Sequence, residues 1–221
     1  MSSPTKVPST AWTIALMGAL SFLAAPSLEA QSLTGRWRIE LRTGVGVRVN
    51  SGTSTSVSGV ETKTDAAGFL GAVGLSRWFS EDVAGVVSVG VLSVGTESRA
   101  GAGGVETSTA VVIPLFIGAR RYWATSDSGS GTRLFGSVEV GPVTGHESSS
   151  SVGQTIVTEA ITRTALGGRA GVGVEFRLGD RVTLGVVGGY TLMTDFSVPI
   201  GGEENHSGAD FGLSLGILLG G

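Results

Sequence analysis

The segment from Arg36 to Val49 constrains the fold more than any other stretch of this chain. Its odd positions are apolar apart from one threonine, whereas its even positions carry charges and glycines. A period of two residues places successive side chains on opposite faces of a β-strand, while a helical period of about 3.6 residues would scatter them. The 14 residues exceed the usual length of a soluble strand, which is about 5–6 residues. They suit a tilted membrane-spanning strand, which needs about 9–11 residues in the bilayer. A half-exposed strand of a soluble sandwich is the alternative.

Seven further segments are patterned in the same way and predict more strands. They are residues 66–79, 83–94, 107–123, 132–143, 159–178, 181–196 and 208–219. Long polar connections rich in Ser, Thr and Gly are predicted as loops at 50–64, 95–106, 144–158 and 197–207, and shorter connections lie at 80–82, 124–131 and 179–180. Long and short connections therefore alternate, as do the extracellular loops and periplasmic turns of outer-membrane barrels. We expect an all-β fold, an eight-stranded antiparallel up-and-down transmembrane β-barrel with both termini on the short-turn side.

One proline lies inside a predicted strand. Pro114 falls among alternating apolar residues of segment 107–123. Proline has no N–H to donate to a neighbouring strand. The sequence therefore predicts a β-bulge at Pro114.

The first 30 residues have the pattern of an export signal. Lys6 precedes an apolar run from Ala11 to Ala25, Pro26 breaks it, and the small residue Ala30 follows Leu28 and Glu29. An uncleaved membrane anchor is the alternative, but the run is short for a span of about 20 residues. We expect a cleaved signal peptide at 1–30 and a single barrel domain at 31–221. The chain has no cysteine, and a net charge of −3 favours no nucleic-acid partner.

The even-numbered face of the first strand predicts a charged barrel interior. By the same alternation the inward charges are Arg38, Glu40, Arg42, Arg48, Glu139, Arg169, Glu175, Arg177 and Asp210. An eight-stranded barrel is just wide enough for side chains to fill. We expect a lumen charge network of Arg38, Glu40, Arg42, Glu139, Arg169, Glu175 and Arg177, packed as ion pairs because an unpaired buried charge is costly. An ion path or a binding site is the alternative.

The aromatic residues predict one interfacial girdle. Trp37, Trp78, Trp123, Tyr122 and Phe176 all lie at strand ends that would share one rim of the barrel. Tryptophan and tyrosine are enriched at membrane–water interfaces. Trp78 has inward parity if Val73 and Leu75 face lipid, so it needs a local register shift or does not belong to the girdle.

The export signal and segments such as GFLGAVGLSRWFSED, IPLFIGARRYW and GGRAGVGVEFRLGDRVTLG resemble the outer-membrane β-barrel domain proteins of the OmpA/OmpX-like eight-stranded group. The resemblance covers the predicted mature chain. It implies an outer-membrane location, surrounding lipid and lipopolysaccharide, and delivery by periplasmic chaperones to the barrel-assembly machinery. It also implies a monomer with no cofactor. The chain departs from the group by ending in Leu218-Leu219-Gly220-Gly221, without the terminal aromatic residue that such barrels often carry.

Three functions are compatible with this pattern. The first, which we favour, is a non-enzymatic barrel with a structural or surface-interaction role through extracellular loops. The second is a lipid-modifying barrel enzyme, for which His206 and Ser207 with Glu203, Glu204 or Asp210 would be the catalytic candidates. The third is a small-solute pore or a conduit for apolar ligands. No phosphate-binding loop, zinc spacing or calcium-binding loop is present in the sequence.

Overall fold

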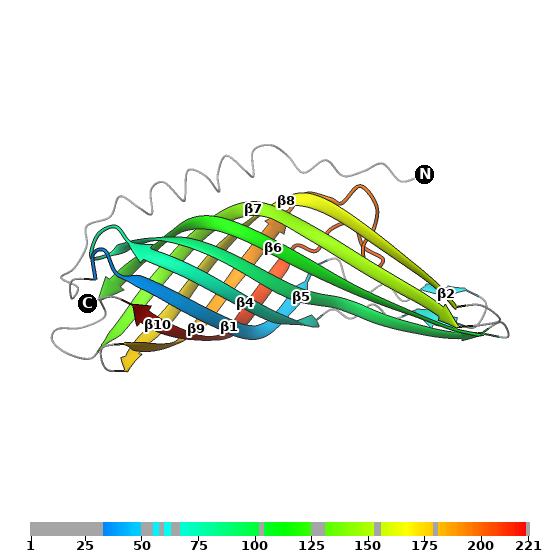
Figure 1. Cartoon of the computed structure of the whole chain (residues 1–221), viewed down its shortest axis with the longest axis horizontal. Helices are drawn as coiled ribbons and strands as arrows, with labels where there is room; N and C mark the ends of the chain where they lie inside the picture. The colour runs from blue at the N-terminus through cyan, green and yellow to red at the C-terminus, as the bar shows by residue number, and fades with distance from the viewer. Residues whose placement is uncertain are drawn as a thin grey trace.

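The computed structural model describes residues 33–49, 55–57, 60–62, 67–101, 104–124, 131–152, 156–178 and 181–219. Eight antiparallel strands close into a barrel, which Figure 1 shows from the side. In order round the barrel they are β1 (Trp37–Arg48), β10 (Gly208–Leu219), β9 (Val182–Met193), β8 (Ile156–Leu178), β7 (Thr132–Val152), β6 (Gly104–Ala124), β5 (Val83–Gly101) and β4 (Ala67–Trp78), which pairs again with β1. β2 (Thr55–Val57) and β3 (Val60–Thr62) form a separate two-stranded sheet. The predicted eight-stranded barrel is confirmed.

Several predictions lie wholly or mostly outside the described residues. They are the signal peptide at 1–30, the turn at 179–180, residues 125–130 of the turn predicted at 124–131, and most of the loop predicted at 50–64, in which only β2 and β3 are described. Among the residues that are described, no helix is long and apolar enough to cross a membrane.

The alternation in β1 separates an outer face from an inner face. β1 pairs with β10 and with β4 in continuous register. Trp37 at the start of β1 lies opposite Leu219 of β10 and Arg77 of β4. Leu41 on the outer face is 54% exposed, whereas Arg38, Glu40 and Arg42 on the inner face are buried. Every barrel strand contributes exposed apolar residues to the outer surface, among them Leu41, Val73, Val89, Ile117, Val140, Val172, Leu184 and Leu215. We call this surface the apolar belt. It contacts lipid, because exposure of so much apolar area to water would be unfavourable.

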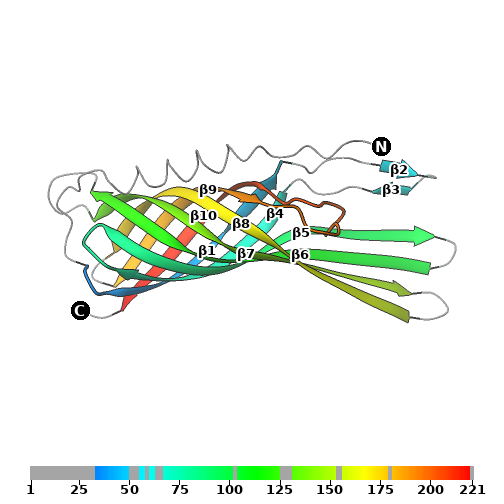
Figure 2. The same cartoon turned by 90° about the horizontal axis from the view of Figure 1, so that it is seen from above.

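Four strands continue well beyond the belt. β5, β6, β7 and β8 have 19, 21, 21 and 23 residues, whereas β1, β4, β9 and β10 have 12 each. Their distal parts form a paired sheet that projects from one end of the barrel (Figures 1 and 2), which we call the sheet extension. Residues 95–106 and 144–158 were predicted as loops, and this prediction was wrong for all but 102–103 and 153–155, which lie outside the described residues. Ser- and Thr-rich segments show no apolar alternation, yet threonine is a good strand residue, so pairing between neighbours extends the strands.

The predicted bulge at Pro114 is also absent. The register of β6 is the same on both sides of Pro114, against β5 and against β7. Instead, a register shift lies between Ser93 and Gly95 of β5. The missing N–H interrupts the ladder locally without inserting a residue, so the inward and outward faces of β6 are kept.

The interior is filled in layers. At the end that bears the sheet extension, an apolar mouth cluster contains Leu92, Val94, Ala110, Val112, Phe116, Val143, Ala165, Met193, Phe196 and Ile200. At the opposite end, a base cluster contains Leu33, Trp78, Ala84, Tyr122, Phe135, Val187 and Leu218. Charged side chains occupy the space between them.

The connection between β9 and β10 folds into the mouth. Within this connection Ile200 is 0% exposed, and Phe196 and His206 are also buried. Asn205 Nδ2 donates to the carbonyl of Met193 at 2.9 Å, and the N–H of Gly201 donates to Glu147 Oε2 at 2.8 Å. The segment predicted as an exposed loop at 197–207 therefore has buried residues that close the barrel mouth.

Candidate functional site

Glu40 is the centre of the charged layer. Its carboxylate accepts two hydrogen bonds from Arg120, at 2.7 and 3.1 Å, and one from Arg38. Arg42 Nε lies 3.2 Å from Glu40 Oε1. One buried carboxylate on β1 thus holds three guanidinium groups, two from its own strand and one from β6.

Two further carboxylates bind arginines from distant strands. Glu175 on β8 accepts hydrogen bonds from Arg38 and, at 2.5 Å, from Arg133 on β7. Asp210 on β10 accepts two hydrogen bonds from Arg169, at 3.1 and 2.5 Å. Paired, charge-assisted bonds of this kind compensate for the desolvation of both partners.

Glu139 on β7 lies between two arginines, at longer distances than the other carboxylates. Ser88 Oγ donates to Glu139 Oε2 at 2.7 Å. Arg169 Nη1 lies 3.6 Å from Glu139 Oε1, and Arg42 Nη2 lies 3.9 Å from Oε2. Glu139 therefore attracts two arginines through space without a close hydrogen bond to either.

The structure brings six of the seven predicted network residues together. They are Arg38, Glu40, Arg42, Glu139, Arg169 and Glu175. Arg177 is not among them; it is half-buried beside the connection into β7, and its N–H donates to the carbonyl of Gly131 at 2.8 Å.

Sequence reasoning missed two members of the network. Arg120 and Arg133 are buried and bind Glu40 and Glu175, and Asp210, expected inward, completes the set. Parity could have found both arginines, because Arg120 follows the outward-facing Ala119 and Arg133 precedes the outward-facing Leu134 in alternating segments. We use the name lumen charge network for these nine residues: Arg38, Glu40, Arg42, Arg120, Arg133, Glu139, Arg169, Glu175 and Asp210.

The predicted aromatic girdle needs a correction. Trp37 and Phe176 are 42% and 44% exposed on the outer surface, and Trp123 is half-buried, but Trp78 and Tyr122 are each 1% exposed inside the barrel. Trp78 follows its inward parity because the registers of β4 with β1 and with β5 contain no shift. Its ring stacks on Tyr122 with centroids 5.5 Å apart.

These two rings join the base cluster to the network. Arg133 lies over Tyr122, with the guanidinium carbon 4.5 Å from the ring centroid, and Arg38 lies 5.5 Å from the centroid of Trp78. Aromatic faces attract cations through their quadrupole. The buried aromatic pair therefore stabilises arginines that carboxylates also hold.

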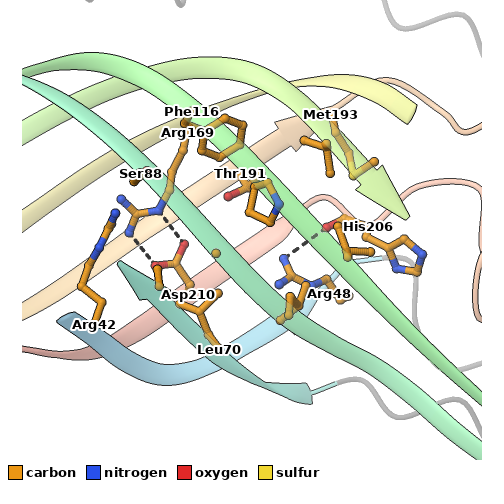
Figure 3. Close-up of a pocket in the computed structure, with 16 residues that line it drawn as sticks. Arg42, Arg48, Leu70, Ser88, Phe116, Arg169, Thr191, Met193, His206 and Asp210 are labelled. Atoms are coloured by element: carbon orange, nitrogen blue, oxygen red, sulfur yellow. Dashed lines mark hydrogen bonds and ion pairs between the residues drawn. The ribbon is translucent and has the colours of Figure 1, made fainter. Parts of the chain in front are cut away.

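A cavity of about 50 Å³ lies between the network and the mouth cluster (Figure 3). Its polar lining includes Arg42, Arg48, Arg169, His206 and Asp210, and its apolar lining comes from residues of the mouth cluster such as Phe116 and Met193. Arg48 Nη1 donates to the carbonyl of His206 at 3.1 Å. The space is far smaller than the roughly 300–1,000 Å³ of pockets for drug-sized ligands.

His206 supports the closed mouth. Its Nε2 lies 2.8 Å from the carbonyl of Ile200, so this nitrogen carries the donated proton. Burial lowers the pKa of His206 below its usual value of 6.5, and the positive charge of Arg48 lowers it further, while the bond to Ile200 acts in the opposite direction. The neutral imidazole is therefore the form that suits the folded connection.

Three of the five catalytic candidates, His206, Ser207 and Asp210, are held in other interactions. Ser207 Oγ accepts a hydrogen bond from the N–H of Met193 at 3.0 Å, and Asp210 binds Arg169. The Nε2 of His206 is bonded to a carbonyl, whereas in a catalytic triad one ring nitrogen bonds to a carboxylate and the other to the nucleophile. Within the described ranges, no group of three or more His, Cys, Asp or Glu is placed to hold a metal ion.

Comparison with known proteins bears on the fold. No protein-family model matches the chain, and no curated protein matches its sequence. The solved structure of Ail, the attachment invasion locus protein of Yersinia pestis, in complex with the heparin analogue sucrose octasulfate, aligns with a TM-score of 0.51 and 13% identity, covering 84% of this chain and 99% of Ail. The fold is that of an outer-membrane β-barrel.

Two other barrels align over similar lengths. Neisserial surface protein A aligns with a TM-score of 0.45 and 12% identity, over 84% of this chain and 97% of that protein. The outer-membrane protein OprG of Pseudomonas aeruginosa aligns with a TM-score of 0.43 and 10% identity, over 87% and 99%. The alignment with Ail and the closed eight-stranded barrel together confirm, at the level of the fold, the resemblance to eight-stranded outer-membrane barrels that the sequence suggested.

Proposed function

We propose that this protein is an integral outer-membrane barrel that is not an enzyme and that presents the sheet extension at the cell surface for interaction with other molecules. The observation that carries the proposal is the continuation of β5–β8 as a paired sheet beyond the apolar belt. A barrel that only had to span the membrane would need strands of about 9–11 residues. The additional paired length is therefore the part of the molecule available for a role outside the bilayer.

The sheet extension offers two edges for contact. β4 pairs with β5 only as far as Leu70 opposite Leu92, and β9 pairs with β8 only as far as Gly167 opposite Met193. Beyond these points the outer edges of β5 and β8 have no strand partner within the part of the chain that the structure describes. Free edge N–H and carbonyl groups can pair with an extended segment of another molecule.

The absence of catalysis is part of the proposal. It is supported by the contacts that the candidate residues make: Ser207 Oγ accepts from Met193, Asp210 binds Arg169, and His206 Nε2 is bonded to the carbonyl of Ile200. The lipid-modifying alternative predicts an altered lipid A composition in cells that lack the protein. An unchanged composition supports the non-enzymatic role.

The proposal also includes the route to the membrane. We expect cleavage after Ala30, delivery by periplasmic chaperones to the barrel-assembly machinery, and a monomer surrounded by lipid and lipopolysaccharide. Mass measurement of the membrane-extracted protein tests the cleavage, because an intact Met1 start contradicts it.

Orientation can be tested with single cysteines, because the natural chain contains none. Glu159→Cys places a thiol at an exposed position on the sheet extension, and Glu81→Cys places one at an exposed position in the short turn between β4 and β5. A membrane-impermeant maleimide should label Glu159→Cys on intact cells and should label Glu81→Cys only after the outer membrane is permeabilised. Labelling of Glu81→Cys alone on intact cells would reverse the orientation and remove the basis of the surface role.

A further inference from the structure

The lumen charge network contains more cations than anions. Its five arginines are Arg38, Arg42, Arg120, Arg133 and Arg169, and its four carboxylates are Glu40, Glu139, Glu175 and Asp210. Each of the nine is at least nine-tenths buried. A buried charge without a counter-charge is strongly unfavourable. The interior therefore needs one more negative charge than these residues supply.

Arg42 is the cation with the weakest compensation. Glu40, at 3.2 Å from its Nε, already accepts hydrogen bonds from Arg38 and Arg120. Glu139, at 3.9 Å from its Nη2, also lies near Arg169. The buried Nε of Arg42 and Nη1 of Arg169 have no hydrogen-bond partner among the described residues. The uncompensated charge is thus located on the side of the network where Arg42 and Arg169 lie.

The cavity adjoins this position. Arg42 and Arg169 line it, and Figure 3 shows their guanidinium groups on the side of the cavity where Asp210 binds Arg169. A water molecule needs about 10–15 Å³ of such space, so a cavity of about 50 Å³ has room for one small anion or a few waters. Neither a sugar nor a fatty acid fits in this volume.

We infer that this cavity binds one small monovalent anion of the halide class, held by Arg42 and Arg169 and enclosed by the mouth cluster. The guanidinium groups supply the charge and the N–H donors. The apolar wall that Phe116 and Met193 contribute penalises strongly hydrated anions, because little in it replaces their lost water. Chloride and bromide are preferred over sulfate for this reason, and gluconate is too large to enter.

The first test is thermal unfolding of the detergent-solubilised full barrel at constant ionic strength, with sodium gluconate replaced stepwise by sodium chloride. A ligand that binds only the folded state raises the unfolding temperature as its concentration passes the dissociation constant. We expect a chloride-dependent rise in the unfolding temperature. An unfolding temperature that does not respond to chloride at constant ionic strength overturns the inference and leaves water as the content of the cavity.

Three variants make this test specific. Arg42→Gln removes the weakly compensated cation and should abolish the response to chloride. Asp210→Asn removes a carboxylate beside the cavity, increases the excess of cations and should enlarge the response. Arg163→Gln, at an exposed arginine of the sheet extension, is the matched control and should respond as the natural protein does. A chloride response that persists unchanged in Arg42→Gln would indicate a general salt effect and overturn the inference.

The second test needs no variant, so it stands even if Arg42→Gln fails to fold. Crystals of the natural protein grown in bromide should give an anomalous peak in the cavity, next to Arg42 and Arg169. Density there without an anomalous signal would show water alone. A bromide peak that appears in crystals while the solution response to chloride is absent would show binding at crystal concentration only, and it too overturns the inference.

Discussion

Glu40 is the residue on which the interior depends most. It lies in the strand that the sequence predicts most clearly, and it holds Arg38, Arg42 and Arg120. All four side chains are buried, so water cannot replace a lost partner. Removal of the carboxylate therefore leaves several cations uncompensated, in a layer that already has more cations than anions.

Glu40→Gln should lower the free energy of unfolding by about 3–5 kcal/mol, the range found when one partner of a buried ion pair is removed. The matched control is Glu159→Gln, at an exposed position on β8, where the change should stay within about 0.5 kcal/mol. Urea titration in lipid vesicles, followed by gel mobility, measures both. The double variant Glu40→Gln/Arg120→Gln should recover part of the loss, because one stranded charge is gone. Equal effects of Glu40→Gln and Glu159→Gln would show that the network does not stabilise the barrel.

On the outer face, Leu41 is the corresponding test residue. It lies in the middle of β1 between Val73 of β4 and Leu215 of β10, and all three are exposed in the apolar belt. Leu41→Arg should lower the free energy of unfolding in vesicles by about 2–4 kcal/mol, the cost of arginine facing lipid at the midplane. Thr158→Arg, at an exposed position of the sheet extension, should be nearly silent in the same urea titration. A tolerated Leu41→Arg would mean that the outer face does not contact lipid there.

At the level of elements, the sheet extension and the inward-folded connection between β9 and β10 distinguish this barrel. Both were predicted as polar loops, and both have definite structure. In the extension, strand pairing continues through serine and threonine residues as far as Val152 opposite Ile156. In the connection, two apolar residues, Phe196 and Ile200, pack into the mouth cluster. Two buried apolar residues are therefore enough to fix this connection, because the mouth cluster provides an apolar surface against which they pack.

The register of the extension can be tested by cross-linking. Thr144 of β7 and Thr164 of β8 are directly opposite, with their hydroxyl oxygens 3.5 Å apart. Thr144→Cys/Thr164→Cys should therefore form a disulfide on oxidation, detected by mass and by gel mobility. Thr144→Cys/Arg163→Cys is the matched control, because adjacent strand residues point to opposite faces and its thiols should not meet. Equal cross-linking of both pairs would contradict this register and favour the loop that the sequence predicted at 144–158.

The connection between β9 and β10 should be sensitive to pH through His206. The pKa of His206 is lowered in the folded connection, so an opened connection, with the ordinary pKa of 6.5, binds the proton more tightly. The closed form is fully stable above this value and loses stability as the pH falls below it. Protease cleavage within residues 194–207 should increase from about pH 7.5 to about pH 5, over the range in which histidine titrates. His206→Gln, which cannot take up a proton, should remove this dependence, and an unchanged dependence in this variant would exclude His206 as its origin.

At the level of the whole molecule, the filled interior decides what the barrel can transmit. Ionic and apolar layers succeed one another from the base cluster to the mouth cluster, and the cavity between them is only about 50 Å³. From this packing we expect no continuous aqueous path through the described part of the barrel. The molecule thus combines a closed barrel with a long external sheet.

Reconstituted protein should show little or no stable conductance in planar bilayers. Ile200→Gly, which weakens the closure of the mouth, should not conduct either, because the lumen charge network still fills the middle layer. Large, reproducible single-channel steps from the natural protein would contradict the filled lumen and favour a pore. Conductance steps seen with Ile200→Gly but not with the natural protein would show that the connection between β9 and β10 closes the barrel to ions.

The amino-acid sequence determines the strands, their two faces and the closed all-β architecture, because alternation is a local property that each segment carries by itself. Even the inward side of Trp78 follows from counting residues along β4. Only the tertiary structure decides which charges meet: Arg38 and Glu175 are 137 residues apart, and they bind because eight registers bring β1 and β8 to the same level of the lumen. The folding of Ile200 into the mouth, the length of the sheet extension and the cavity beside Arg42 depend in the same way on surfaces that exist only after the barrel has closed.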